Sequence, residues 1–232
     1  MPDSIENIAA AFAMQSEKIR TKLISEMANI YKRGGDPSNF AEQMLSANFS
    51  EHIIRDLGFG KDMDSLFAEY DKIAGGVAKT FGEVSSFVVE QLKTLDSLFF
   101  MEHVRDVGEA LTRQMVYAAY TGITEKALIE NLMIATKKLS EAQIGSLTNT
   151  ALRTFSRGTF AMTAQEYAPK DAKYQYVGGV ILEDASRPFC KKNYEKIFTL
   201  AEAQALTNDQ GGGAFIEGGG HNCRHWFELV TE

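Results

Sequence analysis

Apolar residues recur at helical spacing through most of the first two thirds of the chain. They form one stripe over residues 5–30, and over residues 66–95 they return every three or four positions for several turns. Gly75-Gly76 and Gly82 interrupt the second stretch, so the pattern predicts either two helices or one kinked helix there. Residues 1–167 are therefore expected to be helical almost throughout.

Short local signals mark where individual helices begin. Asp36-Pro37 is typical of a helix start. The Asp36 side chain can cap the first backbone N–H groups, and Pro37 lacks an N–H at a position where that group would have no partner within the helix. The segment from Ser140 to Gln143 matches a capping box, and it opens a predicted helix that ends before Pro169. Thr199 is the expected cap of one short helix, residues 200–206.

The C-terminal part of the chain has a different pattern. Lys173–Leu182 is rich in aromatic and β-branched residues, which favours a strand, and Gly178-Gly179 indicates a bulge or a tight bend within it. His225–Val230 is predicted to form another strand. The glycines between Gly211 and Gly220 lack the spacing of a phosphate-binding loop, so a hairpin or a flexible flap is favoured there.

These patterns together predict the fold class and the organisation. The fold is expected to be α+β, with a mostly helical N-terminal region followed by a small α+β C-terminal lobe of short strands and glycine-rich loops. Residues 1–140 are predicted to be the helical region, which is structural and binds partners, and residues 141–232 to be the second region.

Composition and charge narrow the class of protein. Hydrophobic residues make up 44% of the chain, which is enough to bury a core and excludes wholesale disorder. The net charge of −7 argues against binding to nucleic acid through a basic surface. No stretch is long and apolar enough to cross a membrane, and Met1-Pro2-Asp3-Ser4 is acidic where a signal peptide would be basic. We expect a protein that is made in the cytoplasm.

Both cysteines and two of the four histidines fall within a short C-terminal segment. In an extended chain His221, Cys223 and His225 point to the same side, and Cys190 could join them from an earlier loop. Thiolate and imidazole are the ligands that zinc prefers, so zinc is the metal such a set would take. Three other interpretations remain open: two buried reduced cysteines with histidines bonded to loop backbone, a disulfide formed after lysis, and a catalytic thiol.

The residues before Cys190 form a second candidate group. Asp184 and Arg187 can pair across a turn, and Pro188 biases Arg187 toward an extended conformation. Arg224 lies beside the second cysteine, so two arginines and one aspartate could tie the two loops together by forked hydrogen bonds. An anion site built from the two arginines is the functional alternative.

The order of these two loops resembles a known family. Asp184, Arg187, Pro188 and Cys190, then a short helix, then Gly-Gly-Gly-His-Asn-Cys-Arg-His at 218–225, are similar to the C-terminal domain of the phage Mu F-like minor head proteins, also called phage head morphogenesis proteins. The resemblance covers residues 141–230, and the preceding part matches only as generic helix. The motif residues that carry it are Asp184, Arg187, Pro188, Cys190, Gly220, Asn222, Cys223 and Arg224.

This resemblance implies a non-enzymatic function in a virus particle. It implies a minor capsid protein of a tailed bacteriophage, present in few copies near the portal or inside the head, which aids head assembly or genome delivery. The expected partners are the portal protein and/or the capsid protein of the same virion, with self-association left open and direct binding of the packaged DNA doubtful. The apolar stripe of the first helix is the candidate contact surface, and packing on the chain's own bundle is the alternative.

Two functions of other classes remain as alternatives. A zinc-dependent hydrolase would use the Cys/His cluster, with Glu217 or Glu228 as the base and an open position for water. A DNA-binding accessory factor would show binding that weakens steeply with salt.

Overall fold

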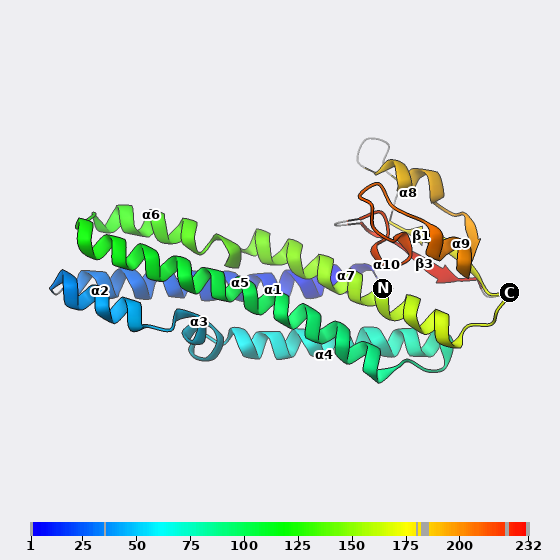
Figure 1. The fold of residues 1–232 in the computed structure, drawn as a ribbon, viewed down its shortest axis with the longest axis horizontal. Helices are drawn as coiled ribbons and strands as arrows, with labels where there is room; N and C mark the ends of the chain where they lie inside the picture. The colour runs from blue at the N-terminus through cyan, green and yellow to red at the C-terminus, as the bar shows by residue number, and fades with distance from the viewer. Residues whose placement is uncertain (1, 35, 180, 182–185, 221–222, 231–232) are drawn as a thin grey trace. The chain divides into compact units, whose positions relative to one another are not determined.

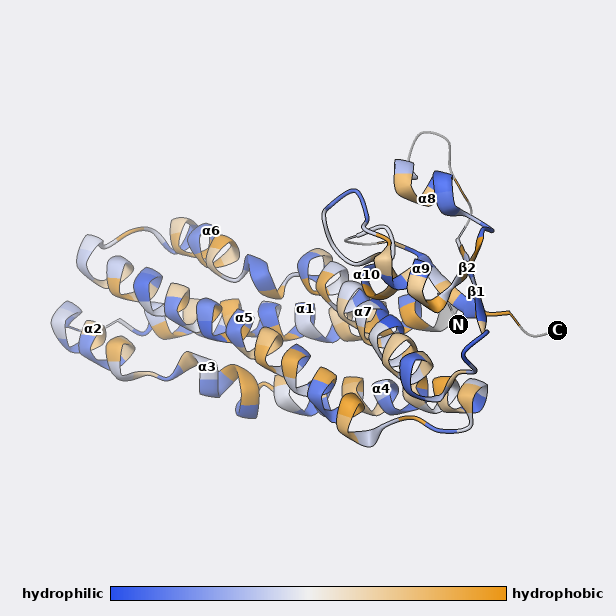
Figure 2. Cartoon of the chain, turned by 45° about the vertical axis from the view of Figure 1, so that its right-hand side comes forward, coloured by the Kyte–Doolittle hydropathy of each residue, from blue (hydrophilic) through white to orange (hydrophobic). Residues whose placement is uncertain are grey.

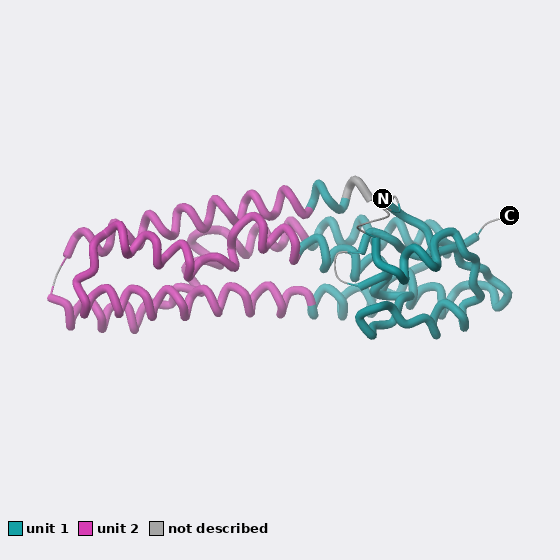
Figure 3. Tube along the Cα trace, turned by 90° about the horizontal axis from the view of Figure 1, so that it is seen from above, with its two compact units in different colours: residues 1–8, 67–95, 148–232 teal, residues 9–66, 96–147 magenta. Residues whose placement is uncertain are grey.

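A computed structural model describes residues 2–34, 36–179, 181, 186–220 and 223–230 (Figure 1). The chain divides into two compact units (Figure 3). Unit 1 comprises residues 1–8, 67–95 and 148–232, and unit 2 comprises residues 9–66 and 96–147. We call residues 173–230, which belong to unit 1, the C-terminal lobe.

Long helices make up most of the described chain before the C-terminal lobe. Hydrophobic and hydrophilic residues alternate along them, as the sequence pattern predicts (Figure 2). No described helix is long and apolar enough to span a membrane. The helices are α1 (Pro2–Lys32), α2 (Pro37–Ser46), α3 (Phe49–Glu51), α4 (Phe59–Phe81), α5 (Ser86–Thr121), α6 (Glu125–Ala135) and α7 (Glu141–Tyr167), with a π-helical turn at His52–Asp56 and a 3-10 turn at Lys137–Leu139.

The local helix signals have the predicted effects. The Asp36 carboxylate accepts hydrogen bonds from the backbone N–H groups of Ser38 and Asn39, each at 3.1 Å, and so caps α2. The interrupted stretch forms two helices, with the break at Gly82, whose φ of +84° ends α4. Gly75-Gly76 lies inside α4, because a glycine weakens a helix without ending it when the surrounding turns are packed.

Unit 2 is held together by apolar side chains from several helices. The ring of Phe12 packs against Phe59 and Phe100, with centroids 5.6 and 5.5 Å apart. Leu23 and Met27 on the same helix are buried as well. The apolar stripe of α1, our candidate partner surface, is therefore used within the chain itself, and the alternative interpretation of that stripe is correct.

The helical part of unit 1 is also centred on aromatic residues. Tyr70 of α4 is fully buried and packs against Phe155 of α7 with ring centroids 4.4 Å apart, and Phe81 packs against Phe160 with centroids 5.2 Å apart. Phe160 in turn contacts Phe215 of the C-terminal lobe, with ring centroids 6.2 Å apart. The lobe core thus joins α7 through aromatic contacts.

A three-stranded antiparallel sheet forms the centre of the C-terminal lobe. Its order is β2 (Ile197–Thr199), β1 (Lys173–Gly178), β3 (His225–Leu229), so strands distant in sequence are neighbours. The predicted strands correspond to β1 and β3, which pair from Tyr174↔Leu229 to Gly178↔His225. Gly178 has a φ of +125°, and a Cβ there would lie 2.6 Å from the Arg224 carbonyl oxygen, so the tight bend requires glycine.

Short helices connect the strands of the lobe. They are α8 (Pro188–Asn193), α9 (Leu200–Ala205) and α10 (Ala214–Glu217). Thr199 caps α9 as predicted, and the Glu202 side chain reaches back to the Thr199 backbone N–H at 2.8 Å to complete a capping box. The mostly helical N-terminal region with a small α+β C-terminal lobe is therefore confirmed.

The division of the sequence at residue 140 stays a prediction. The boundaries between the two compact units fall inside α1, α4, α5 and α7. Because long helices contribute to both compact units, the units do not test whether residues 1–140 and 141–232 have separate functions.

Candidate functional site

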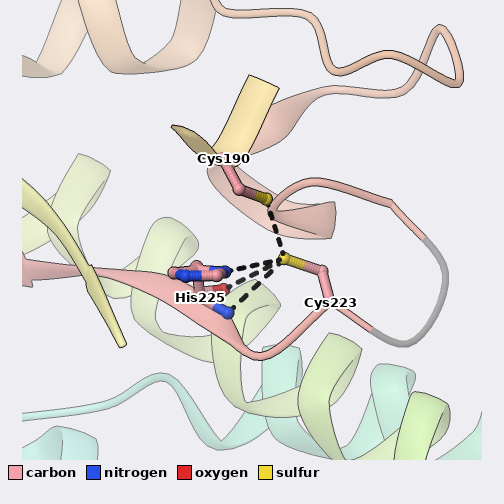
Figure 4. A group of neighbouring side chains, drawn as sticks. All are labelled: Cys190, Cys223 and His225. Carbon is pink, nitrogen blue, oxygen red and sulfur yellow. Dashed lines mark hydrogen bonds between the residues drawn. The ribbon is translucent and has the colours of Figure 1, made fainter. Parts of the chain in front are cut away.

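Two cysteines and one histidine from separate segments converge in the C-terminal lobe. Cys190 lies on α8, Cys223 lies just before β3, and His225 is the first residue of β3 (Figure 4). The two Sγ atoms are 3.7 Å apart, and Sγ of Cys223 is 3.6 Å from Nδ1 of His225. One donor atom from each of the three side chains lies within 4.8 Å of the other two, and the three residues are almost completely buried. We call them the Cys/Cys/His cluster.

Local features of the sequence place Cys190 at this point. Arg187 is extended, as expected before Pro188, and Pro188 occupies the first turn of α8. Asp209, from a later loop, accepts a hydrogen bond from the backbone N–H of Phe189 at 2.9 Å. The start of α8 is thereby attached to the segment that leads into α10.

Strand pairing places His225 beside Tyr176. The pairing of β1 with β3 brings the tyrosine ring against the imidazole, with centroids 5.7 Å apart and an angle of 23° between the planes. The Tyr176 hydroxyl lies 3.6 Å from the sulfurs of both Cys190 and Cys223. Nε2 of His225 is buried with no hydrogen-bond partner in the described part of the chain, so the ring makes its polar contact through Nδ1.

The backbone at Gly218 and Gly219 packs directly against the sulfurs. A Cβ at Gly219 would overlap Sγ of Cys190 and lie 3.2 Å from Sγ of Cys223. A Cβ at Gly218 would lie 2.8 Å from the carbonyl oxygen of His225. The interpretation of this glycine segment as a flexible flap is wrong for Gly218 and Gly219, because they are buried and lie close to the cluster.

Two arginines hold the backbone around the cluster. Arg157 of α7 is buried and donates hydrogen bonds to the carbonyl oxygens of Glu217, at 3.0 Å, and Cys223. Arg187 donates to the carbonyl oxygen of Gly219 at 3.0 Å. The predicted bridge between the two loops therefore exists for Arg187, with a backbone carbonyl as its acceptor.

The environment makes the two cysteines unequal acids. The hydrogen bond from Cys190 lowers the pKa of the Cys223 thiol despite burial, and His225 and the Arg157 guanidinium act in the same direction. The shared hydrogen bond and burial raise the pKa of Cys190. Burial also raises the pKa of Tyr176, so its hydroxyl stays protonated and can donate to a thiolate. Cys223 is therefore the first of the pair to ionise.

The other predicted site residues are distributed differently. Arg224 forms an ion pair with Glu6, with Nε and Oε1 3.3 Å apart, rather than completing an anion site with Arg187. Gly220, with a φ of +102°, accepts a hydrogen bond from the Cys223 backbone N–H and so shapes the turn before the cysteine. Asp184, His221 and Asn222 lie outside the described residues.

Sequence reasoning missed Arg157 and Tyr176. A signal for Arg157 was present, because Arg153 and Arg157 are the sole charged residues between Glu141 and Glu166 on α7. Arginines without an acidic residue one turn away need partners from elsewhere in the fold. Tyr176 carried no comparable signal, since an alternating aromatic residue is ordinary in a strand.

The structure distinguishes the earlier alternatives for the cysteines. Both are free thiols, and His225 faces a sulfur rather than loop backbone. Glu217 and Glu228, the bases of the hydrolase alternative, are exposed, whereas the cluster is buried. The Glu228 carboxylate instead accepts a hydrogen bond from Nε1 of Trp226 at 2.9 Å.

Comparisons with known protein families, with curated proteins and with solved structures found no match to this chain. The described residues define a mostly helical protein whose small antiparallel sheet carries a buried Cys/Cys/His cluster. Functional inference therefore depends on this cluster and on the exposed surfaces of the helices.

Proposed function

We propose that this chain is a non-enzymatic minor head protein of a tailed bacteriophage. The observation that carries the proposal is that the two loops which carry the sequence resemblance meet in one buried cluster, although their cysteines are 33 positions apart. A resemblance spread over two unrelated surface loops would have little weight. Two loops whose cysteines meet in one buried cluster form a single structural motif, so the two parts of the resemblance support each other.

The burial of the cluster favours a structural role over a catalytic one. Cys190, Cys223 and His225 are at most 5% exposed. A substrate reaches a catalytic thiol or an open metal position through a cleft. A cluster enclosed in this way instead joins the segments that surround it.

A surface for a partner subunit is available on α5. Among the described helices α5 has the largest number of exposed large apolar side chains, and exposed apolar surface is a common mark of a contact site. Within unit 2 the exposed large apolar residues of α5 are Leu98, Phe99, Tyr117 and Tyr120. We therefore assign the contact with the portal or capsid protein to this helix rather than to α1.

The direct test is the composition of phage particles from the source strain. Particles are induced, purified by density, and analysed by quantitative mass spectrometry alongside the portal and major capsid proteins. We expect the chain in DNA-filled particles at a copy number close to that of the portal and far below that of the capsid protein. Its absence from purified particles would overturn the proposal. Retention of the free chain on duplex DNA with a steep salt dependence would favour an accessory DNA-binding factor.

A pair of variants tests the assigned surface. Leu98→Glu introduces charge on α5, and Leu45→Glu does the same on α2, where Leu45 is exposed to a similar degree. The α5 variant should reduce incorporation into particles, whereas the α2 variant should be incorporated normally. Equal incorporation of both variants would contradict the assignment to α5.

A further inference from the structure

We propose that the Cys/Cys/His cluster is a binding site for a soft divalent metal ion, with zinc as the resident ion. The ligands are the sulfurs of Cys190 and Cys223 and the imidazole of His225, and their role is to hold the C-terminal lobe together. This inference goes beyond the proposed function, because a metal site in the lobe can be present or absent whatever the chain assembles with.

The distances among the donor atoms match tetrahedral coordination. Zinc bonded to two thiolates at about 2.3 Å holds the sulfurs about 3.8 Å apart, and it holds a sulfur about 3.6 Å from an imidazole nitrogen bonded at about 2.0–2.1 Å. The observed separations are 3.7 Å between the sulfurs and 3.6 Å from Sγ of Cys223 to Nδ1 of His225. A disulfide would require the sulfurs to approach to about 2.05 Å. Two donor separations therefore match the spacing that a metal imposes, and all three donor atoms lie within 4.8 Å of one another.

The surroundings of the sulfurs resemble the outer shell of a metal centre. Sγ of Cys223 accepts a hydrogen bond from the backbone N–H of His225 at 3.4 Å, and the Tyr176 hydroxyl lies within hydrogen-bond distance of both sulfurs. Such donors orient thiolate ligands and stabilise their charge. The backbone at Gly218-Gly219 covers the sulfurs and leaves no room for a side chain.

The position of the ligands explains what the metal does. Cys190 comes from α8, and Cys223 and His225 come from β3 and the turn before it, so one ion joins segments that the sheet alone does not connect. The sheet offers few pairs for stability, since β2 has three residues. In a small lobe, the free energy of metal binding is also free energy of folding.

The test uses the full chain, reduced and freed of metal with a chelator, and Co²⁺ as a spectroscopic probe. We expect one equivalent to produce thiolate-to-cobalt charge-transfer absorption and the intense visible bands of tetrahedral cobalt, and one equivalent of Zn²⁺ to abolish both. Zn²⁺ should also raise the melting temperature of the lobe, followed by the fluorescence of Trp226, the single tryptophan, which lies on β3. No spectral change at equimolar cobalt in the reduced chain would overturn the proposal.

Variants locate the ion within the chain. Cys190→Ser, Cys223→Ser and His225→Gln should each lose the tetrahedral cobalt spectrum, whereas His103→Gln on α5 should keep it. If a ligand variant fails to fold, the wild-type spectrum still decides, because its charge-transfer intensity reports whether thiolates bind the ion. Retention of the full spectrum in Cys190→Ser or Cys223→Ser would show that the ion binds elsewhere, and would overturn the assignment.

Discussion

Unit 2 and the C-terminal lobe are stabilised in different ways. In unit 2 the buried side chains are mostly apolar, such as Leu111 and Met115, and they repeat along long helices. The lobe has an aromatic core too, with Phe215 and Phe227 among its rings, but its segments are also joined by the Cys/Cys/His cluster, by glycine backbone packed on the sulfurs, and by the Arg157 guanidinium from α7. In unit 2 many apolar contacts each contribute part of the stability, whereas the Cys/Cys/His cluster joins its segments through a few specific polar contacts.

This difference predicts that removing one side chain will have different effects in unit 2 and in the lobe. Loss of one apolar side chain in unit 2 leaves a cavity with a local free-energy cost. Loss of one polar contact in the lobe leaves buried partners without hydrogen bonds, and the segments they joined separate. Helix content and the fluorescence of Trp226 report the two regions separately, because helices dominate the first and the tryptophan lies in the second.

The largest expected effect is in unit 2. Leu111→Ala removes a fully buried side chain and should lower the free energy of unfolding by about 3 kcal/mol, measured by urea denaturation and far-UV circular dichroism. Leu98→Ala, on the same helix but exposed, is the matched control and should change it by less than about 0.5 kcal/mol. Equal effects of the two changes would contradict the described core.

The second largest effect is expected from replacing Arg157, the buried arginine that donates hydrogen bonds to the lobe backbone. Arg157→Met removes the guanidinium donor to the carbonyl oxygen of Cys223 and one of the two donors to that of Glu217, so we expect the lobe to lose about 2–3 kcal/mol while helix content changes little. Trp226 fluorescence and limited proteolysis measure this loss. The exposed Arg113→Met is the control for the change in charge. Unaltered protease resistance of the lobe would refute the contact.

A pair of glycine substitutions should act in opposite directions. Gly219→Ala places a methyl group against the sulfurs and should destabilise the lobe by about 2 kcal/mol. Gly75 lies in the interior of α4, where an added Cβ would meet no atom within 4 Å apart from its chain neighbours and the helix's own backbone, so Gly75→Ala should stabilise by about 1 kcal/mol. Thermal melts of both variants give the two signs, and a melting temperature of Gly219→Ala that is unchanged or raised would show that Gly219 is not packed against the cluster.

The smallest effect is a pH dependence in unit 2. Burial lowers the pKa of His52, but hydrogen bonds to Asp56 and Glu26 more than offset it, so the net pKa is raised above 6.5. The folded state therefore favours the protonated ring. Its contribution is fully present below pH 6.5 and is lost as the pH rises through the raised value.

This pH dependence is measured as a difference between melting temperatures. The gap between wild type and His52→Gln should be larger at acidic than at alkaline pH. His103→Gln supplies the reference for removal of a helix histidine. A difference in melting temperature that is larger at alkaline pH would contradict the raised pKa of His52.

The sequence was sufficient to predict the long helices and two strands. Helical period, the Asp36 and Thr199 caps, and the alternation in β1 and β3 are local signals, and local structure follows them. The short elements β2, α8 and α10 were missed, because three to six residues show no measurable period and form only against the rest of the lobe.

The candidate site was predictable in part. Residue chemistry brought Cys190, Cys223 and His225 together, since few other residue types share that preference for one another. The partner of Arg224 was not predictable, because Glu6 lies at the other end of the sequence. The role of Gly219 was not predictable either, because a glycine in a sequence can indicate an unusual backbone conformation or close packing, and the sequence does not distinguish the two.

The most direct test of the account is the proximity of the two sulfurs in the native chain. The reduced, metal-free protein is oxidised mildly at low concentration, digested without reductant, and analysed by peptide mass spectrometry. Because the sulfurs lie 3.7 Å apart, an intramolecular bond between Cys190 and Cys223 should form in the monomer. Two independently alkylated cysteines, or crosslinks only between separate chains, would contradict the meeting of the two loops.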